Sequence, residues 1–175
     1  MLSFLSPLEV LSNISLTEET EAAEFGCGSG KFALLLAKQL RHGKVYGIDI
    51  QNEPLIVLKK QADAKNLFNI ETRRGNLEKV GGSGIGDRRL DLVLIPNLLF
   101  QVNDKKAVVQ EAKRILKDGG KLLIVDWKPE AAILDTSRDD RISSEKIIEI
   151  ADELDMELVK EFEAGAYHYG LVFKR

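Results

Sequence analysis

The stretch Glu24-Phe25-Gly26-Cys27-Gly28-Ser29-Gly30 separates a short apolar run, Ala22 to Phe25, from a segment whose apolar residues have helical spacing. Glycine permits the tight turn that such a junction needs, and it lets a ligand approach the backbone closely. A helix that starts after the turn offers free N–H groups and a partial positive charge. The stretch therefore predicts a strand, a ligand-binding glycine turn and a helix, which is the opening unit of an α/β fold.

The rest of the chain repeats this alternation of strand and helix. Apolar runs predict strands over 22–25, 45–48, 69–73, 92–95 and 122–125, and then over 157–162 and 167–173. Gly165 lies between the last two runs and indicates a hairpin. Apolar strands that alternate with amphipathic helices imply a parallel sheet covered on both faces. We therefore predict a doubly wound α/β sheet of about seven strands, mostly parallel, with a C-terminal antiparallel hairpin.

Capping residues indicate where helices begin and end. Ser6-Pro7 predicts a helix start, with serine as the N-cap and proline at the first helical position. Asp104 or its neighbour Asn103 predicts another helix start, and Gly119-Gly120 predicts the end of that helix. Residues 75–89 hold five glycines and little periodicity. We expect this segment to be a flexible crossover between the third and fourth strands.

Charge and cysteine content exclude several classes of protein. The chain has 25 Lys and Arg residues against 28 Asp and Glu residues, a net charge of −3, and its basic residues are scattered, so we expect no dedicated nucleic-acid surface. The single cysteine, Cys27, argues against a disulfide scaffold and against a metal site. The sequence has no apolar run of the roughly 18 residues that a membrane span needs, and no signal-peptide pattern. We therefore expect a cytoplasmic location and no membrane partner.

Three classes of ligand use glycine turns of this kind. A nucleotide P-loop needs glycine where Phe25 stands and Ser or Thr where Phe32 stands, so that class is rejected. A dinucleotide fingerprint needs its third glycine where Lys31 stands, although Asp49 lies at a suitable distance for a ribose contact. That partial match is weak evidence. The third class is S-adenosylmethionine, and further motifs favour it.

Taken together, these motifs resemble a small class I S-adenosylmethionine-dependent methyltransferase, similar to the ubiquinone/menaquinone-type methyltransferases. The family's first motif, an acid, one residue and Gly-x-Gly-x-Gly, matches residues 24–30, and its second is the acid Asp49 after Val-Tyr-Gly-Ile. Its third and fourth motifs correspond to Gly75-Asn76-Leu77-Glu78 and to the strand before Pro96-Asn97. Residues 111–120 are very like the family's Glu-Ala-x-Arg-x-Leu-Lys-Pro-Gly-Gly.

The resemblance implies a Rossmann-like fold and one methyltransferase domain over residues 1–175. Within it, residues 1–15 would form an N-terminal helix or lid, and residues 22–126 the core that binds S-adenosylmethionine. Residues 127–175 would supply a substrate-side loop, a helix and the closing hairpin. The loop from Trp127 to Arg141 is expected to complete the lid.

The resemblance also assigns residues to the cofactor. It implies that Asp49 accepts hydrogen bonds from the ribose hydroxyls, that Glu24 organises the turn near the amino-acid end, and that Asn76 and Leu77 surround the adenine. A solvated strand carboxylate remains the alternative for Glu24, and ordinary loop packing the alternative for Asn76 and Leu77. The predicted cofactor-binding residues are Glu24, Gly26, Cys27, Gly28, Gly30, Asp49, Ile50, Asn76, Leu77, Pro96 and Asn97.

The candidates for catalysis are His168, Asn97 and Tyr167. If the last strand is antiparallel, as in the family, Tyr167 and His168 open it at the end of the sheet that carries the other motifs. His168 is then the histidine placed to act as a base near neutral pH, with strand packing as the alternative. The resemblance makes Asn97 a wall of the reaction centre. Cys27 is expected to pack within the turn, and a low-pKa thiol is the less favoured alternative.

The expected activity is in-line methyl transfer from S-adenosylmethionine to a small-molecule acceptor, with the oligomeric state open, monomer or homodimer. Such transfer requires alignment and exclusion of water, and it needs a base only where the acceptor loses a proton. A single cysteine argues against arsenic methylation through paired thiols. The alternatives are a non-catalytic member of the fold that binds the cofactor, a nucleotide or a partner protein, and, less favoured, a small nicotinamide-dependent reductase.

Overall fold

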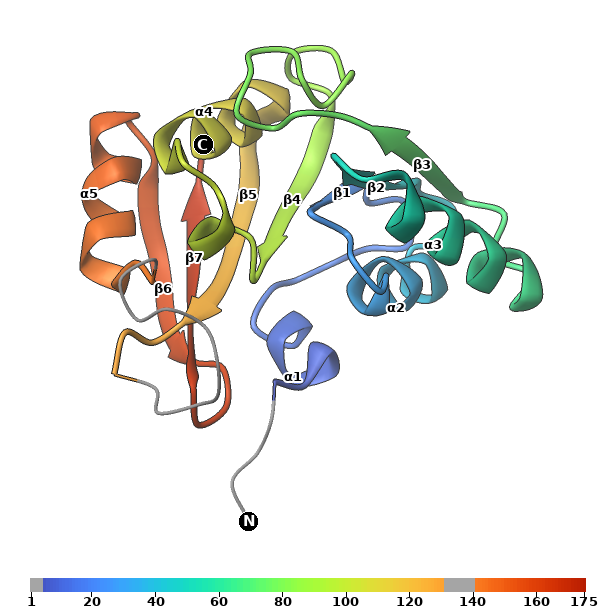
Figure 1. Ribbon diagram of the computed structural model, residues 1–175, viewed down its shortest axis with the longest axis horizontal. Coiled ribbons are helices and arrows are strands. Elements are labelled where there is room, and N and C mark those ends of the chain that lie inside the picture. The colour runs from blue at the N-terminus through green and yellow to red at the C-terminus, as the bar shows by residue number, and fades with distance from the viewer. Residues whose placement is uncertain (1–4, 131–140) are drawn as a thin grey trace.

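The computed structural model describes residues 5–130 and 141–175, and in them one seven-stranded sheet carries helices on both faces (Figure 1). The sheet has the order β3-β2-β1-β4-β5-β7-β6. β7 runs antiparallel to β5 and β6, and the other neighbours are parallel. The predicted doubly wound sheet with a closing antiparallel hairpin is confirmed. The strands are β1 (Ala22–Phe25), β2 (Val45–Asp49), β3 (Ile70–Arg74), β4 (Leu90–Pro96), β5 (Leu116–Trp127), β6 (Glu157–Glu163) and β7 (His168–Lys174).

The helices divide between the two faces of the sheet. Along β4, Leu92 and Leu94 join one apolar cluster while Val93 and Ile95 join the other, because successive strand residues point to opposite faces. The first cluster lies under α1, α2 and α3, and the second under α4 and α5. The helical elements are α1 (Pro7–Leu11), α2 (Lys31–Gln39), α3 (Asn52–Ala64), the 3-10 turn η1 (Leu99–Gln101), α4 (Lys105–Ile115) and α5 (Ser144–Glu153).

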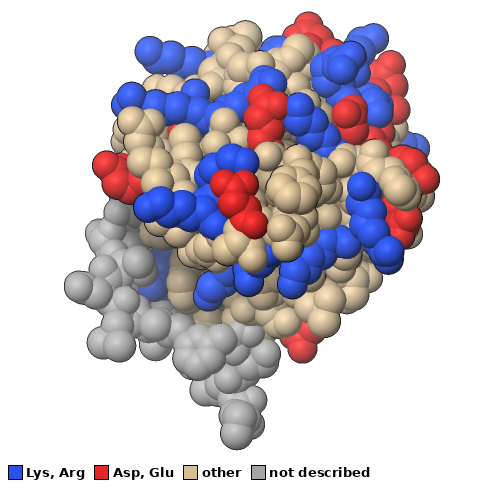
Figure 2. Space-filling view, turned by 90° about the vertical axis from the view of Figure 1, so that its right-hand side faces the viewer, with Lys and Arg blue, Asp and Glu red and all other residues tan. Residues whose placement is uncertain are grey.

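The surface over β3 and α3 has mixed charge. Figure 2 shows Lys and Arg side chains interleaved with Asp and Glu on this side of the molecule. Lys44 and Arg73 both pair with Glu71, at 2.5 and 2.6 Å, and Lys59 pairs with Asp63 at 2.8 Å. In residues 5–130 and 141–175, no helix has the length and apolar character that a membrane span requires.

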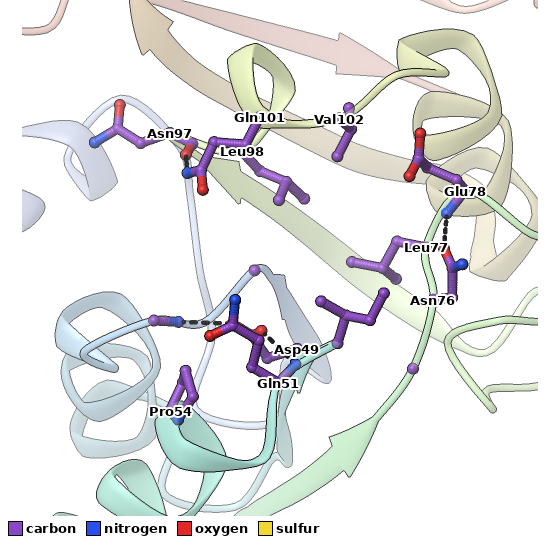
Figure 3. Close-up of a pocket in the computed structure, with 14 residues that line it drawn as sticks. Asp49, Gln51, Pro54, Asn76, Leu77, Glu78, Asn97, Leu98, Gln101 and Val102 are labelled. Carbon is purple, nitrogen blue, oxygen red and sulfur yellow. Dashed lines mark hydrogen bonds between the residues drawn. The ribbon is translucent and has the colours of Figure 1, made fainter. Parts of the chain in front are cut away.

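The central strand β1 brings the sequence motifs to one edge of the sheet. Ala22 and Ala23 have low strand propensity, but β1 pairs with β2 on one side and with β4 on the other, and its four residues are buried. Because these strands are parallel, their carboxyl ends meet at the same edge. Asp49 at the end of β2 and Asn97 after β4 therefore lie around one hollow (Figure 3).

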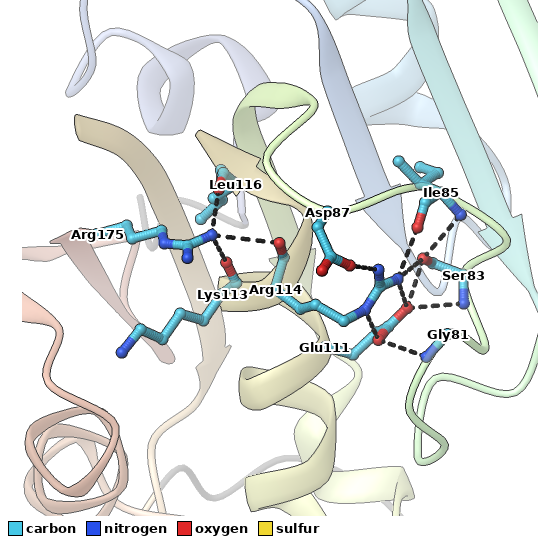
Figure 4. A network of polar contacts seen from close by, with 9 residues as sticks. All are labelled: Gly81, Ser83, Ile85, Asp87, Glu111, Lys113, Arg114, Leu116 and Arg175. Atoms are coloured by element: carbon cyan, nitrogen blue, oxygen red, sulfur yellow. Dashed lines mark hydrogen bonds and ion pairs between the residues drawn. The ribbon is translucent and has the colours of Figure 1, made fainter. Parts of the chain in front are cut away.

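The crossover after β3 differs from the expectation. Residues 75–89 were expected to be flexible, but the buried Glu111 carboxylate of α4 accepts hydrogen bonds from Gly81 N–H at 2.9 Å and Ser83 N–H at 3.0 Å. Arg114 pairs with the same carboxylate and also with Asp87 (Figure 4). These contacts fix the crossover against α4, so the prediction of flexibility is wrong. Sequence periodicity cannot show a loop held by a buried acid.

The end of α4 also differs from the expectation. Gly119-Gly120 was predicted to end this helix, but α4 ends at Ile115, and β5 already begins at Leu116. The Arg175 guanidinium donates to the carbonyls of Lys113, Arg114 and Leu116 at 2.8, 3.2 and 2.5 Å (Figure 4). A side chain from the C-terminus therefore satisfies the carbonyls at the helix end, where a glycine cap was expected. The predicted caps at Ser6 and Asp104 are confirmed.

We predict that Glu111→Ala lowers the free energy of unfolding by about 3 kcal/mol or more, because it leaves Arg114 and two backbone N–H groups without their buried partner. Urea denaturation measures this change. Glu149→Ala is the matched control, since Glu149 is exposed on α5 and forms an ion pair with the exposed Lys146, and we expect a change within about 0.5 kcal/mol. Equal effects of the two substitutions would contradict the role assigned to Glu111.

Candidate active site

A first cavity of about 390 Å³ lies at the carboxyl ends of β1, β2 and β3 and beside the segment after β4 (Figure 3). Three segments surround it in the close-up: Asp49 to Pro54, Asn76 to Glu78, and Asn97 to Val102. Its lining residues are Gly26, Gly28, Asp49, Ile50, Gln51, Pro54, Gly75, Asn76, Leu77, Glu78, Asn97, Leu98, Gln101 and Val102.

A second cavity of about 440 Å³ adjoins the first. Gly26, Gly28, Asn97 and Gln101 line both, so the two cavities meet at the glycine turn and the end of β4. The second cavity reaches past the turn to α1 and to the ends of β5 and β7. Its lining residues are Leu5, Pro7, Glu24, Gly26, Cys27, Gly28, Ser29, Lys31, Phe32, Pro96, Asn97, Gln101, Trp127 and His168.

Asp49 connects the end of β2 to the glycine turn. One carboxylate oxygen accepts a hydrogen bond from Gly28 N–H at 3.2 Å, and the other accepts one from Gln51 N–H at 3.0 Å. Each oxygen keeps a further lone pair, so the carboxylate can still bind hydroxyl donors in the first cavity. Asp49 is therefore held in place before any ligand enters.

The glycine turn needs its glycines for two different reasons. Gly30 has φ +73°, which residues with a side chain rarely adopt, and a Cβ there would lie 2.6 Å from Leu58 Cδ1 of α3 and would displace that side chain. Gly28 has φ +46°, and a Cβ there would meet nothing nearer than 3.9 Å. Its open side gives a ligand room to approach the backbone where the two cavities meet.

Glu24 is the buried acid of the turn. The residue is 2% exposed, and its carboxyl accepts a hydrogen bond from Ala33 N–H, in the first turn of α2, at 2.7 Å. Burial raises the pKa of Glu24 to about 8; the hydrogen bond from Ala33 opposes that shift and the nearby Asp49 carboxylate adds to it. Glu24 therefore carries little charge at neutral pH without a cationic ligand, and the solvated-carboxylate alternative is wrong.

Asn76 lines the first cavity, but its side-chain oxygen is already engaged. Asn76 Oδ1 accepts a hydrogen bond from Glu78 N–H at 3.0 Å, and Glu78 Oε1 in turn accepts one from Asp104 N–H at 2.6 Å. This chain of contacts fixes the turn that presents Leu77, which is buried against the cavity. A second lone pair on the Asn76 oxygen leaves it able to accept one more donor.

Asn97 combines a left-handed backbone with an unpartnered side-chain oxygen. Its φ is +51°, in the left-handed region that asparagine adopts more readily than most other non-glycine residues. Its Oδ1 is buried without a hydrogen-bond partner among the described residues, while its backbone carbonyl accepts from Gln101 Nε2 at 2.8 Å. An unsatisfied buried oxygen that lines a cavity is typical of a functional position.

His168 faces the second cavity from β7. Its side chain is 4% exposed and lies against Trp127, with ring centroids 4.0 Å apart and planes tilted by 38°. Burial lowers the pKa of His168 to about 4, and the nearby cations Arg141 and Lys128 lower it further. The imidazole is thus neutral at pH 7 and too weak a base to hold a proton there. Tyr167 lines neither cavity, and its catalytic role stays a prediction.

Cys27 lines the second cavity as a buried thiol. Burial raises its pKa to about 12, and the carboxyls of Glu24 and Asp49 raise it too. The predicted packing role fits this environment, and the alternative of a low-pKa thiol is wrong. The helix N-terminus is not sufficient to offset burial between two acids.

Three residues at the site are absent from the predicted cofactor and catalytic sets: Gln101, Trp127 and Asp126. Gln101 lines both cavities and belongs to no motif, whereas Trp127, expected in the lid loop, is the last residue of β5 and lines the second cavity. Asp126, buried at the end of β5, accepts a hydrogen bond from Leu99 N–H at 2.9 Å and so fixes η1, which carries Gln101. Burial raises the pKa of Asp126 to about 6. A polar residue at the end of an apolar strand was the available signal for Asp126.

The predicted cofactor residues gather at these cavities. All of them line one cavity or both apart from Gly30, whose contacts are with α3. A family model for methyltransferase domains matches residues 16–166. The chain therefore belongs to this methyltransferase-domain family, in which S-adenosylmethionine is the methyl donor.

Particular relatives share part of this chain. It is 29% identical over 134 residues to the arsenite methyltransferase of Aquipseudomonas alcaligenes, covering 73% of this chain and 38% of that protein. It is 29% identical over 119 residues to the demethylmenaquinone methyltransferase of Bacillus mycoides, and the match covers 67% of this chain and 49% of that protein. The chain thus spans less than half the length of these two curated relatives.

A solved structure shares the fold over nearly the whole chain. The SAM dependent methyltransferase from Aquifex aeolicus superposes with a TM-score of 0.87, covering 97% of this chain and 89% of that one. Sequence identity is 23%, so this likeness is one of fold.

We predict that Glu24→Gln removes part of the pH dependence of stability. Folding raises the pKa of Glu24 from 4.5 to about 8. The protonated carboxyl therefore contributes its full share of the free energy of unfolding below pH 4.5, and that contribution is lost as pH rises from 4.5 to about 8. Between about pH 5 and pH 8, the wild type should lose on the order of 3 kcal/mol more than the variant, at about 1.4 kcal/mol per pKa unit. Urea denaturation at both pH values measures the difference. Parallel losses would show that Glu24 is ionised in the folded protein.

Proposed function

We propose that the chain is an S-adenosylmethionine-dependent methyltransferase that methylates a small-molecule acceptor by in-line transfer. The observation that carries this proposal is the meeting of two cavities at the glycine turn and Asn97. When bound, S-adenosylmethionine supplies an activated methyl group: its sulfur–carbon bond breaks as the acceptor–carbon bond forms, S-adenosylhomocysteine leaves, and any acceptor proton passes to solvent.

The first cavity has the chemistry that a nucleoside needs. Asp49 offers two carboxylate oxygens, and charged acceptors bind hydroxyl donors more strongly than neutral ones. Ile50 and Leu77 offer apolar surface for a base. Gly28 leaves space beside the backbone, and Glu24 beyond it gives a carboxyl for a cationic amino-acid end. These residues support binding of the cofactor along the glycine turn, with its nucleoside in the first cavity and its amino-acid end near Glu24.

The second cavity is suited to align an acceptor and exclude water. Leu5 and Pro7 bring the N-terminal segment over it, which supports the proposed lid role of residues 1–15. Of the proposed 127–141 lid, residues 131–140 lie outside the described residues, while Trp127 lines the cavity. A cytoplasmic location is part of the proposal, supported by a free buried thiol, which suits a reducing compartment.

Titration calorimetry with S-adenosylhomocysteine, NAD and ATP tests the cofactor. We expect binding of S-adenosylhomocysteine alone, because the fold belongs to the methyltransferase-domain family and Lys31 stands where a dinucleotide site needs glycine. Binding of NAD alone would favour a nicotinamide-dependent reductase. Binding of S-adenosylhomocysteine without methyl turnover on any acceptor in a broad screen would favour the non-catalytic alternative.

We predict that Asp49→Ala weakens S-adenosylhomocysteine binding at least about tenfold, since it removes charge-assisted hydrogen bonds to the ribose and the anchor of Gly28. Calorimetry gives the dissociation constant. Asp63→Ala is the control, because Asp63 forms an exposed ion pair with Lys59 on the surface of α3 and lines neither cavity, so its loss should leave binding unchanged. An unchanged affinity in Asp49→Ala would end the ribose assignment.

We predict that arsenite is not an acceptor, even though relatives carry that activity in their names. Arsenic binds thiolates, and the single cysteine, Cys27, is 2% exposed with its pKa raised to about 12. Incubation with S-adenosylmethionine, arsenite and glutathione should yield no methylarsenic species by mass spectrometry. Cys27→Ser should leave S-adenosylhomocysteine affinity within about twofold. Methylarsenic formation that depends on Cys27 would overturn this expectation.

A further inference from the structure

The second cavity contains polar atoms that the protein itself does not satisfy. Within residues 5–130 and 141–175, Asn97 Oδ1 and both ring nitrogens of His168 are buried without hydrogen-bond partners, and both residues line this cavity. His168 is 4% exposed, so bulk solvent does not cover its ring. Leaving such groups unpaired in a buried site is unfavourable. A ligand that pairs with both side chains would recover that cost.

The wall around these atoms is flat and aromatic. Trp127 and His168 are directly paired across β5 and β7, and their rings lie 4.0 Å apart between centroids. Phe32 and Pro7 add further apolar surface to the same cavity. Flat aromatic surface of this kind favours a planar ring over a chain or a bulky aliphatic group.

The charges around the cavity disfavour a cationic acceptor. Among the described residues that line it, Lys31 is the only cation and Glu24 the only carboxyl, and Glu24 is the group suited to the amino-acid end of the cofactor. The Arg141 guanidinium lies 5.8 Å from the centre of the Trp127 ring. An ammonium group would therefore enter a basic region with no carboxylate left to pair with it.

A neutral imidazole completes the recognition. At pH 7 His168 has one nitrogen that donates and one that accepts, whereas Asn97 Oδ1 can only accept. A hydroxyl group is both donor and acceptor, so it can donate to Asn97 Oδ1 and also pair with His168. A ketone or ether has no proton to give to Asn97.

We propose that the second cavity binds a planar aromatic alcohol, whose hydroxyl pairs with Asn97 and His168 while its ring lies on the Trp127 wall. This substrate class rests on the proposed function, because such a molecule is the acceptor of the methyl group. In this proposal Asn97 and His168 are the residues that determine specificity for the acceptor.

Binding of three matched probes tests the proposal: para-cresol, para-xylene, which lacks the hydroxyl, and para-methylbenzylammonium, which carries a cation. Trp127 is the only tryptophan, so its fluorescence reports occupancy of this wall. We expect para-cresol to bind at least about tenfold more tightly than either of the other probes, which corresponds to about 1.4 kcal/mol. Equal affinities of the three probes would overturn the proposal.

Three variants test which side chains cause the preference for para-cresol over para-xylene. Asn97→Gly removes the side chain without strain at positive φ, and His168→Phe removes the nitrogens but keeps a ring. Each should reduce the preference for para-cresol over para-xylene to about threefold or less. Tyr169→Phe is the control, because the Tyr169 hydroxyl donates to Ile142 O on the other face of the sheet, and the preference should persist there. A preference retained in both Asn97→Gly and His168→Phe would overturn the assignment.

Titrations with and without S-adenosylhomocysteine separate the two proposals. Suppose that S-adenosylhomocysteine fails to bind, but the preference for para-cresol persists and depends on Asn97 and His168. The proposed recognition of an aromatic alcohol is then supported, and the proposed methyltransferase activity is contradicted. If S-adenosylhomocysteine binds and the three probes bind with equal affinity, the cofactor assignment is supported and the aromatic-alcohol class of acceptor is contradicted.

Discussion

The hydrogen bond from Ala33 N–H to the buried carboxyl of Glu24 joins the central strand to the first long helix. The N-cap of α2 is Gly30, which has no side chain to satisfy the free N–H groups of the first helical turn. The acid at the end of β1 takes that role from across the turn. The contact fixes where α2 begins, and with it the path of the backbone between the two cavities. Burial of the same carboxyl raises its pKa and so couples its protonation to the stability of the fold.

Two other buried acids hold site segments by the same means. Asp126 at the end of β5 binds the first N–H of η1, and Glu111 of α4 binds N–H groups of the crossover that begins beside Asn76. In each case a carboxyl on a regular element fixes an irregular segment that lines or adjoins a cavity. A site supported this way is organised before its ligand arrives, which lowers the entropy lost on binding. Loops near the site are therefore ordered by side chains outside it.

Local sequence patterns were sufficient to predict the sheet, the glycine turn and the position of Asp49, because residues close together in sequence determine the alternation of strands and helices and the geometry of turns. They failed where a distant residue decides the structure. Arg175 ends α4 from 59 or more residues away in sequence, and Glu111 orders a crossover that composition alone describes as flexible. Gln101 was missed because its place depends on the left-handed turn at Asn97, and asparagine occurs in many other conformations, so its residue type alone does not predict that turn. Trp127 was expected to begin the lid loop, but it is the last residue of β5, and its pairing with His168 places it in the wall of the second cavity.

The environment of His168 also limits what it can do for methyl transfer. An imidazolium beside a sulfonium would place two positive charges in a region of low dielectric, where like charges repel strongly. Burial and the neighbouring cations keep the ring neutral, so it can stand near the cofactor's charge without that penalty. The same low pKa prevents it from retaining an acceptor's proton at neutral pH. In the proposed reaction His168 would therefore hold and orient the acceptor by a hydrogen bond, while the acceptor's proton would pass to solvent.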